Sequence, residues 1–216
     1  MNRESTSPGL AHAPIAVEKY YRAHAQIYDA TRWSFLFGRA GILCDIAAAG
    51  EPTRILEVGC GTGKNLASLC RRFPQATVTG VDLSEAMLER AQRKTANFGG
   101  RVQLRHRAYD APLGEGEGFD LVLFSYALSM FNPGFESAMA AAQRDLVAGG
   151  HIAVVDFHDT RLRLFERWMG VNHVRMNGQL RPLLREMFEP RVDRLHAAYG
   201  GVWRYLMFEG KKRAAG

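Results

Sequence analysis

The feature that most constrains the fold of this chain is a glycine-rich loop at residues 57–63, with the sequence Glu-Val-Gly-Cys-Gly-Thr-Gly. A short apolar run at 54–58 leads into it, and residues 65–72 after it have a helical pattern that ends near Pro74. Glycines at such a strand-to-helix turn let the backbone turn sharply and approach a ligand closely. The loop therefore predicts an α/β fold of the kind that binds nucleotides or nucleosides.

Two acidic residues narrow the class of ligand. The loop is no phosphate-binding P-loop, because Asn65 follows Lys64 where Ser or Thr is needed and Val58 stands where the first glycine belongs. Glu57, just before the loop, would repel a pyrophosphate but attract a sulfonium and an α-amino group. Asp82, 25 residues after Glu57, follows the next predicted strand, where a carboxylate reaches both ribose hydroxyls. This pair disfavours a nicotinamide dinucleotide.

The rest of the chain alternates between strand-like and helix-like segments. A helix is expected after the second strand with Ser84 as its cap, and another before Gly149-Gly150, which would end it. Near the C-terminus, Gly200-Gly201 suits a tight hairpin turn. We predict an α/β, Rossmann-like, doubly wound and mostly parallel seven-stranded sheet with an antiparallel C-terminal hairpin. The expected strands are 54–58, 76–81, 102–104, 119–124, 151–157, 192–199 and 202–209, and the expected helices are 65–72, 84–94 and 135–146.

Three stretches together, ILEVGCGTGKNL, VTGVDLSEAML and FDLVLFSYALSMF, resemble the class I S-adenosylmethionine-dependent methyltransferases over roughly residues 54–157. The resemblance implies S-adenosyl-L-methionine as the cofactor, with the loop around its methionine and ribose, Asp82 on the ribose diol and Asp110 on the adenine. Tyr109 stands where the family usually has glycine. The implied cofactor-binding residues are Tyr28, Glu57, Gly59, Cys60, Gly61, Gly63, Asp82, Leu83, Met87, Tyr109, Asp110, Ala111 and Ser125.

The methyl acceptor has to be sought outside these motifs. Residues 19–39, KYYRAHAQIYDATRWSFLFGR, are similar to enzymes that N-methylate diacylglycerylhomoserine and to phosphatidylethanolamine N-methyltransferases. This resemblance implies that Tyr28 lies over the cofactor and that the amino head group of such a lipid is methylated. The alternative is a small soluble metabolite: a quinone, phenol, thiol or amine.

Three side chains are candidates for the chemistry of transfer: His158, Tyr126 and Tyr28. His158 follows the strand expected at 151–157 and would accept a proton from an ammonium group, although a solvent-facing loop histidine explains it equally well. Aromatic residues near the N-terminus would form a cation–π cage for a methylated ammonium, while core packing accounts for at least half of them. The members of that cage are Tyr20, Tyr21, Tyr28, Trp33 and Tyr126. No metal cluster is expected.

Composition bears on organisation and partners. We expect a flexible tail at 1–14 and one methyltransferase domain at 15–216, in which 15–50 form a helical substrate cap and 160–190 an insertion over the active site. Residues 161–216 hold 12 of the 28 Lys and Arg residues but 5 of the 22 Asp and Glu residues. This excess indicates a solvated basic face or contact with an acidic surface.

The apolar run 33–37 beside Arg32 and Arg39 suits a bilayer interface or a buried helix. Nucleic acid is not expected as a partner, because residues 125–128 lack the Asn/Asp-Pro-Pro-aromatic motif of enzymes that methylate base amines. Without a signal-like segment, the expected location is cytoplasmic, with peripheral contact to the inner membrane face as an option. The sequence gives no basis for an oligomeric state.

Overall fold

The strands of this chain form a seven-stranded sheet in the order β3-β2-β1-β4-β5-β7-β6, as seen in a computed structural model that describes residues 35–114, 116 and 118–213. The first five strands in this order are parallel, and β7 is antiparallel to both β5 and β6. The predicted fold class is therefore confirmed. The strands are β1 Arg54–Val58, β2 Thr77–Asp82, β3 Val102–His106, β4 Phe119–Ser125, β5 Leu146–Thr160, β6 Phe188–Ala198 and β7 Trp203–Lys212.

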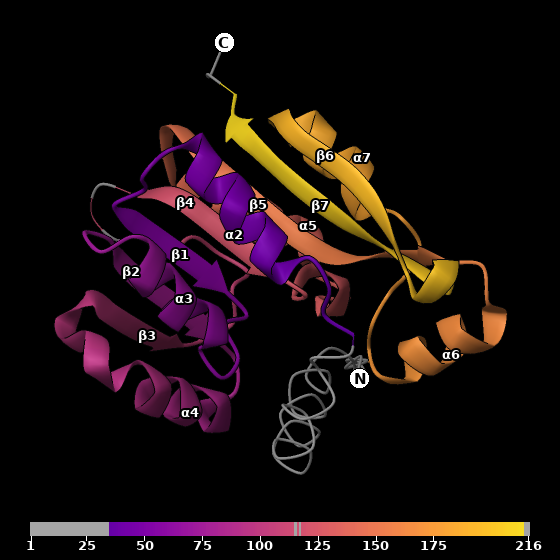
Figure 1. Ribbon diagram of the computed structural model, residues 1–216, viewed down its shortest axis with the longest axis horizontal. Coiled ribbons are helices and arrows are strands. Elements are labelled where there is room, and N and C mark those ends of the chain that lie inside the picture. Colours follow the sequence, from indigo (N-terminus) through magenta and orange to yellow (C-terminus); the bar gives the residue numbers. More distant parts are fainter. Residues whose placement is uncertain (1–34, 115, 117, 214–216) are drawn as a thin grey trace, which may run out of the picture.

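Helices cover both faces of this sheet (Figure 1). On one face lie α2 Arg39–Ala49, α3 Lys64–Arg72 and α4 Glu85–Thr95, and on the other α5 Phe135–Asp145 and α7 Leu180–Met187. α6 Arg163–Val171 lies at the periphery, beside the turn between β6 and β7 (Figure 1). Short 3-10 segments are η1 Ala96–Arg101, which is interrupted at Gly99, η2 Leu128–Met130 and η3 Tyr199–Gly201.

The central strands are mostly apolar because both of their faces are covered. In β4, Leu121 and Leu123 pack in the core beneath α2 and α3, whereas Val122 and Phe124 pack in the core beneath α5 and α7. This is the arrangement that a continuous apolar run predicts for a buried parallel strand. The ends of these strands are thereby held rigidly, and their connecting loops form the edge where ligands bind in such folds.

One predicted boundary is wrong. The helix expected to run to Leu146 and to end at Gly149-Gly150 stops at Asp145, and β5 begins at Leu146. Gly149 has a φ of 75°, and the register of β4 against β5 shifts between Phe119 and Leu121. Gly149 therefore shapes an irregular strand start instead of a helix end, because a positive φ serves either purpose.

The C-terminal hairpin is confirmed. Gly200 and Gly201 in its turn have φ values of 65° and 100°. β6 is one of the two outer strands of the sheet, and a register shift between Pro190 and Val192 interrupts its pairing with β7.

The two expected covering segments are only partly described. Residues 1–34, which include the predicted tail, lie outside the described residues. Within the predicted cap, α2 packs through Ile42 and Ile46 into the core above β5 and β7. Within the 160–190 range, α7 belongs to the helix layer of the sheet through Leu180 and Leu184. No helix among residues 35–213 has the length and apolar character needed to cross a bilayer.

Candidate functional site

The glycine loop follows β1 at the edge where the parallel strands end. Gly59, Gly61 and Gly63 all have positive φ, at 70°, 54° and 74°. The N–H groups of Gly59 and Cys60 donate to the carbonyl of Val81 at 2.8 and 3.0 Å, which ties the loop to β2. Three left-handed residues in five favour glycine strongly. The result is a stretch of backbone at the end of the sheet in which every second residue lacks a side chain.

Glu57 lies at the base of this loop and is fully buried. Its Oε1 accepts a hydrogen bond of 2.8 Å from Nδ2 of Asn65, a buried side chain in the first turn of α3. Asn65 also lines a cavity of about 360 Å³ between α2 and α3, which Thr62 and Arg39 border as well. The sequence did not single out Asn65, because an Asn at a helix start is ordinary and its partner is eight residues away.

Asp82 is the second acid of the loop. Its Oδ2 accepts from the Gly61 N–H at 2.7 Å and its Oδ1 accepts from the Ser84 N–H at 2.9 Å. These bonds orient the carboxylate beside the loop, and each carboxylate oxygen has capacity for two donors. Ser84 occupies the N-cap position of α4, but its side chain makes no capping bond, so the predicted cap is wrong in its chemistry.

Both acids act on Cys60. Burial, and then the charges of Asp82 and Glu57, raise the pKa of the Cys60 thiol well above its usual range. The thiol is therefore protonated and unreactive at neutral pH, and Cys60 contributes shape rather than a nucleophile. Both predicted carboxylates border the loop, because Asp82 accepts from Gly61 within it and Glu57 lies in β1 just before it.

The residues predicted to contact an adenine are divided between surface and core. Met87 is buried in α4, whereas Leu83, Asp110 and Ala111 are exposed. Tyr109 is buried, and its hydroxyl donates a 2.8 Å hydrogen bond to Asp145 of α5. The Tyr109 side chain therefore packs in the core and bonds to α5. This is the structural difference that a tyrosine makes at a position where the family usually has glycine.

The end of β4 carries Ser125 and Tyr126. Ser125 Oγ accepts from Arg39 Nε at 3.0 Å, and the Tyr126 hydroxyl donates to the carbonyl of Phe37 at 2.7 Å. Burial, and then the charge of Asp156, raise the pKa of Tyr126, so its hydroxyl stays protonated. Both side chains therefore hold the start of α2 against the sheet. Arg39 was not identified from sequence, because its partner is 86 residues away.

Asp156, near the end of β5, is a buried acid that sequence reasoning missed. It accepts hydrogen bonds from the N–H groups of Ser129, at 3.1 Å, and Phe157, at 2.8 Å. Burial raises its pKa to about 6. The one available signal was an acidic residue inside the apolar run 151–157.

His158 lies two residues further along β5. Its side chain is 10% exposed, and its Nε2 is 3.9 Å from Asp159 Oδ2. Within the described part of the chain, its buried Nδ1 has no hydrogen-bond partner, and burial lowers the pKa of the ring. The ring lies against Gly178, whereas the Tyr126 ring contacts Phe157. The third predicted catalytic residue, Tyr28, lies outside the described residues, as do Tyr20, Tyr21 and Trp33.

The described end of the apolar run 33–37 packs against other aromatic rings. Phe35 stacks on Trp203 with ring centroids 5.4 Å apart, and Phe37 meets Tyr199 edge-on at the same separation. Phe35 and Phe37 therefore belong to an aromatic cluster beside the β6–β7 turn.

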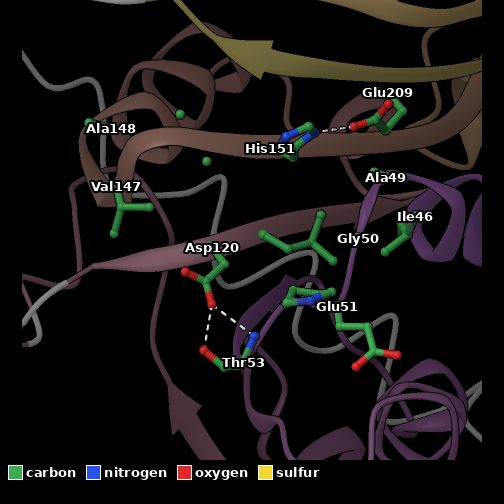
Figure 2. Close-up of a pocket in the computed structure, with 14 residues that line it drawn as sticks. Ile46, Ala49, Gly50, Glu51, Thr53, Asp120, Val147, Ala148, His151 and Glu209 are labelled. Atoms are coloured by element: carbon green, nitrogen blue, oxygen red, sulfur yellow. Dashed lines mark hydrogen bonds and ion pairs between the residues drawn. The ribbon is translucent and has the colours of Figure 1, made fainter.

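A second cavity, of about 450 Å³, lies at the opposite ends of the parallel strands, where β4 begins (Figure 2). Asp120, where β4 begins, accepts 2.8 Å hydrogen bonds from the N–H and hydroxyl of Thr53, and His151 contacts the buried Glu209. This cavity is separated from the glycine loop by the length of β1 and β4. Among the described residues, no group of three His, Cys, Asp or Glu side chains is placed to hold a metal ion.

The central part of the chain is similar to a domain of known proteins. Residues 55–150 match a family model described as a methyltransferase domain. The demethylmenaquinone methyltransferase of Thermus thermophilus is 34% identical over 114 residues, which are 52% of this chain and 51% of that protein. The chain spans about half or less of the length of the first curated relatives that it matches.

Solved structures extend the likeness in fold. N-methyltransferase NodS of Bradyrhizobium japonicum, in complex with S-adenosylhomocysteine, has a TM-score of 0.76 at 16% identity, covering 92% of this chain and 99% of that one. The 1,6-didemethyltoxoflavin-N1-methyltransferase of Burkholderia thailandensis has a TM-score of 0.71 at 20% identity, covering 97% and 94%. Residues 55–150 are thus similar to a methyltransferase domain, and the chain shares its fold with these solved methyltransferases.

Proposed function

We propose that this protein transfers a methyl group from S-adenosyl-L-methionine to a nucleophilic atom of a small or lipid acceptor. The observation that carries the proposal is that two carboxylates, Glu57 and Asp82, border a loop whose three glycines have positive φ, with Asp82 bonded to the loop and Glu57 to Asn65 after it. Bound there, the cofactor would supply a methyl group attached to a positively charged sulfur. The sulfur compound is the leaving group and becomes a neutral thioether.

The residues of the loop fit such a cofactor. Glu57 provides a buried negative charge for the amino group and the sulfonium, held in place by Asn65. Asp82, fixed by two backbone N–H groups, is oriented for the ribose hydroxyls. The bare backbone at Gly59 and Gly61 lets a ligand approach closely. The other proposed contacts are those of Tyr28, Cys60, Gly63, Leu83, Met87, Tyr109, Asp110, Ala111 and Ser125, of which Tyr109 contributes backbone.

For an amine acceptor, the chain has to position a neutral nitrogen and take away one proton. Most of the rate in such a displacement comes from orientation and exclusion of water. We assign the proton to His158, whose lowered pKa keeps the ring neutral at pH 7. Tyr126 and Tyr28 would border the acceptor, with the Tyr126 hydroxyl committed to Phe37 and only its ring available.

The finer proposal names the acceptor as the amino head group of a lipid such as diacylglycerylhomoserine, and it rests on residues 19–39 of the sequence. The second candidate is a small metabolite. It is supported by similar proteins, among which are a demethylmenaquinone, a trans-aconitate and a 1,6-didemethyltoxoflavin methyltransferase.

One labelling experiment tests both levels. The full chain is incubated with methyl-labelled cofactor and either a bacterial lipid extract or an aqueous metabolite extract. Asp82→Ala, which should bind the cofactor more weakly, is the control at a limiting cofactor concentration. Label in the lipid fraction supports head-group methylation, and label only in the aqueous products refutes it. If neither extract is labelled while the cofactor binds, methyl transfer itself is refuted.

A further inference from the structure

The outer face of α6 has an exposed apolar stripe. Leu164, Trp168 and Val171 are 82%, 52% and 78% exposed, although they recur at the i, i+4, i+7 spacing of one helix face. The neighbouring face of the same helix, Phe165 and Met169, packs into the core cluster. α6 is therefore apolar over a wider arc than the protein core covers.

Basic residues border this stripe. Arg163 and Arg167 are exposed, lie one turn apart and, by helical periodicity, sit beside Leu164 and Val171. No carboxylate in the described part of the chain forms an ion pair with either arginine. Arg161 precedes the helix and is also exposed. An apolar stripe with arginines along its flank is the composition of helices that lie in the interface of an anionic bilayer.

The position of α6 suits that role. The helix lies at the periphery of the molecule, beside the β6–β7 turn (Figure 1), where the 49% exposed Leu162 extends the apolar surface at its start. The whole segment 161–216 carries the excess positive charge of the chain. Of its basic residues, Arg161, Arg163 and Arg167 lie in or just before α6, where the one acid is Glu166, so positive charge borders the apolar surface of this helix.

We propose that the outer face of α6 docks on anionic phospholipid membranes, with Leu164, Trp168 and Val171 in the interface and Arg163 and Arg167 at the phosphates. Docking would bring the proposed lipid head group to the molecule. It is nevertheless measured without cofactor or methyl transfer, so its failure and that of the proposed function can be told apart.

The test is cosedimentation of the full chain with vesicles. Vesicles of equal parts phosphatidylglycerol and phosphatidylcholine should bind the protein, and pure phosphatidylcholine should bind it much less. Each arginine near an anionic surface contributes about 1 kcal/mol, so Arg163→Gln with Arg167→Gln should weaken binding roughly 30-fold. High salt should weaken binding as well, since surface charges are screened.

Matched variants separate docking from general charge. Arg71→Gln with Arg72→Gln, at the exposed end of α3, removes the same charge elsewhere and should bind as the wild type does. Leu164→Ser with Val171→Ser changes side chains that are already exposed, so the fold should persist, and binding should fall at least about tenfold. Equal binding of this variant and the wild type overturns the proposal. A second outcome also overturns it: the wild type does not bind vesicles but self-associates in light scattering, and Leu164→Ser with Val171→Ser abolishes this self-association.

Discussion

At the scale of single residues, the site depends on acids that are held by hydrogen bonds before any ligand arrives. Asp82 has both carboxylate oxygens on backbone N–H groups, and Glu57 is held by Asn65. Preorganised groups of this kind bind without paying a further ordering cost. The predictions at this scale separate residues that would hold the cofactor from residues that hold the fold.

Asp82→Ala should weaken S-adenosylmethionine binding by roughly 1–3 kcal/mol, because hydrogen bonds to a charged group are lost. Isothermal titration calorimetry measures the change. Glu89→Ala, on the exposed side of α4, removes an equal charge nearby and should leave the affinity unchanged. If both variants bind like the wild type, Asp82 is not a cofactor residue.

Tyr109→Phe should act on stability and not on cofactor affinity. Its hydroxyl donates to Asp145, which also accepts from the N–H of Leu113. Loss of this one donor to a buried carboxylate should lower the free energy of unfolding by roughly 1–3 kcal/mol, as measured by urea denaturation. A variant of normal stability and weakened affinity would instead place the Tyr109 side chain at the ligand.

Asp156 should make the fold less stable as the pH rises. Burial raises its pKa from 3.8 to about 6, so the folded state holds the proton more tightly than the unfolded state. The resulting stability is present below pH 3.8 and is lost as the pH rises through about 6, a change of about 3 kcal/mol.

The measurement is the free energy of unfolding of the wild type and of Asp156→Asn between pH 4 and pH 7. The difference between them, wild type minus variant, should fall over this range because Asn does not titrate. A difference that stays constant contradicts the raised pKa.

At the scale of elements, the glycine loop matters as much for helix packing as for the ligand. A Cβ at Gly63 would lie 2.9 Å from both Cα and Cβ of Ala91, so α3 and α4 approach each other across this glycine. This is the role expected of the third glycine in such a fingerprint, which permits close packing.

Gly63→Ala should therefore destabilise the protein by roughly 2–4 kcal/mol, from the left-handed φ and the clash with α4 together. Gly100→Ala is the matched control, because a Cβ there has nothing within 4 Å. Thermal and urea unfolding of the two variants checks the difference. Equal stabilities would mean that α4 can shift freely.

At the scale of the whole molecule, the fold could be predicted because its evidence is local. Apolar runs identified the buried strands, and glycines at residues 59–63 and 200–201 identified the turns. The site could be predicted only as far as its residues lie in motifs. The sequence did not predict a place in the site for Arg39, Asn65 and Asp156. Each is distinguished by a hydrogen-bond partner or a degree of burial that exists only in the folded chain. The start of β5 was not predicted, because a glycine with positive φ fits a helix end and an irregular strand equally well.

One outer strand of the sheet, β6, has features that oppose pairing with a second copy of the chain. β6 presents Glu189, Pro190 and Arg191 as exposed residues beside its register shift. Proline offers no N–H to a neighbouring chain, and charges with a local distortion make a poor template for further strand pairing. Along this edge, a neighbouring copy meets a strand that opposes further strand pairing, and this lowers the tendency of crowded molecules to aggregate through β6.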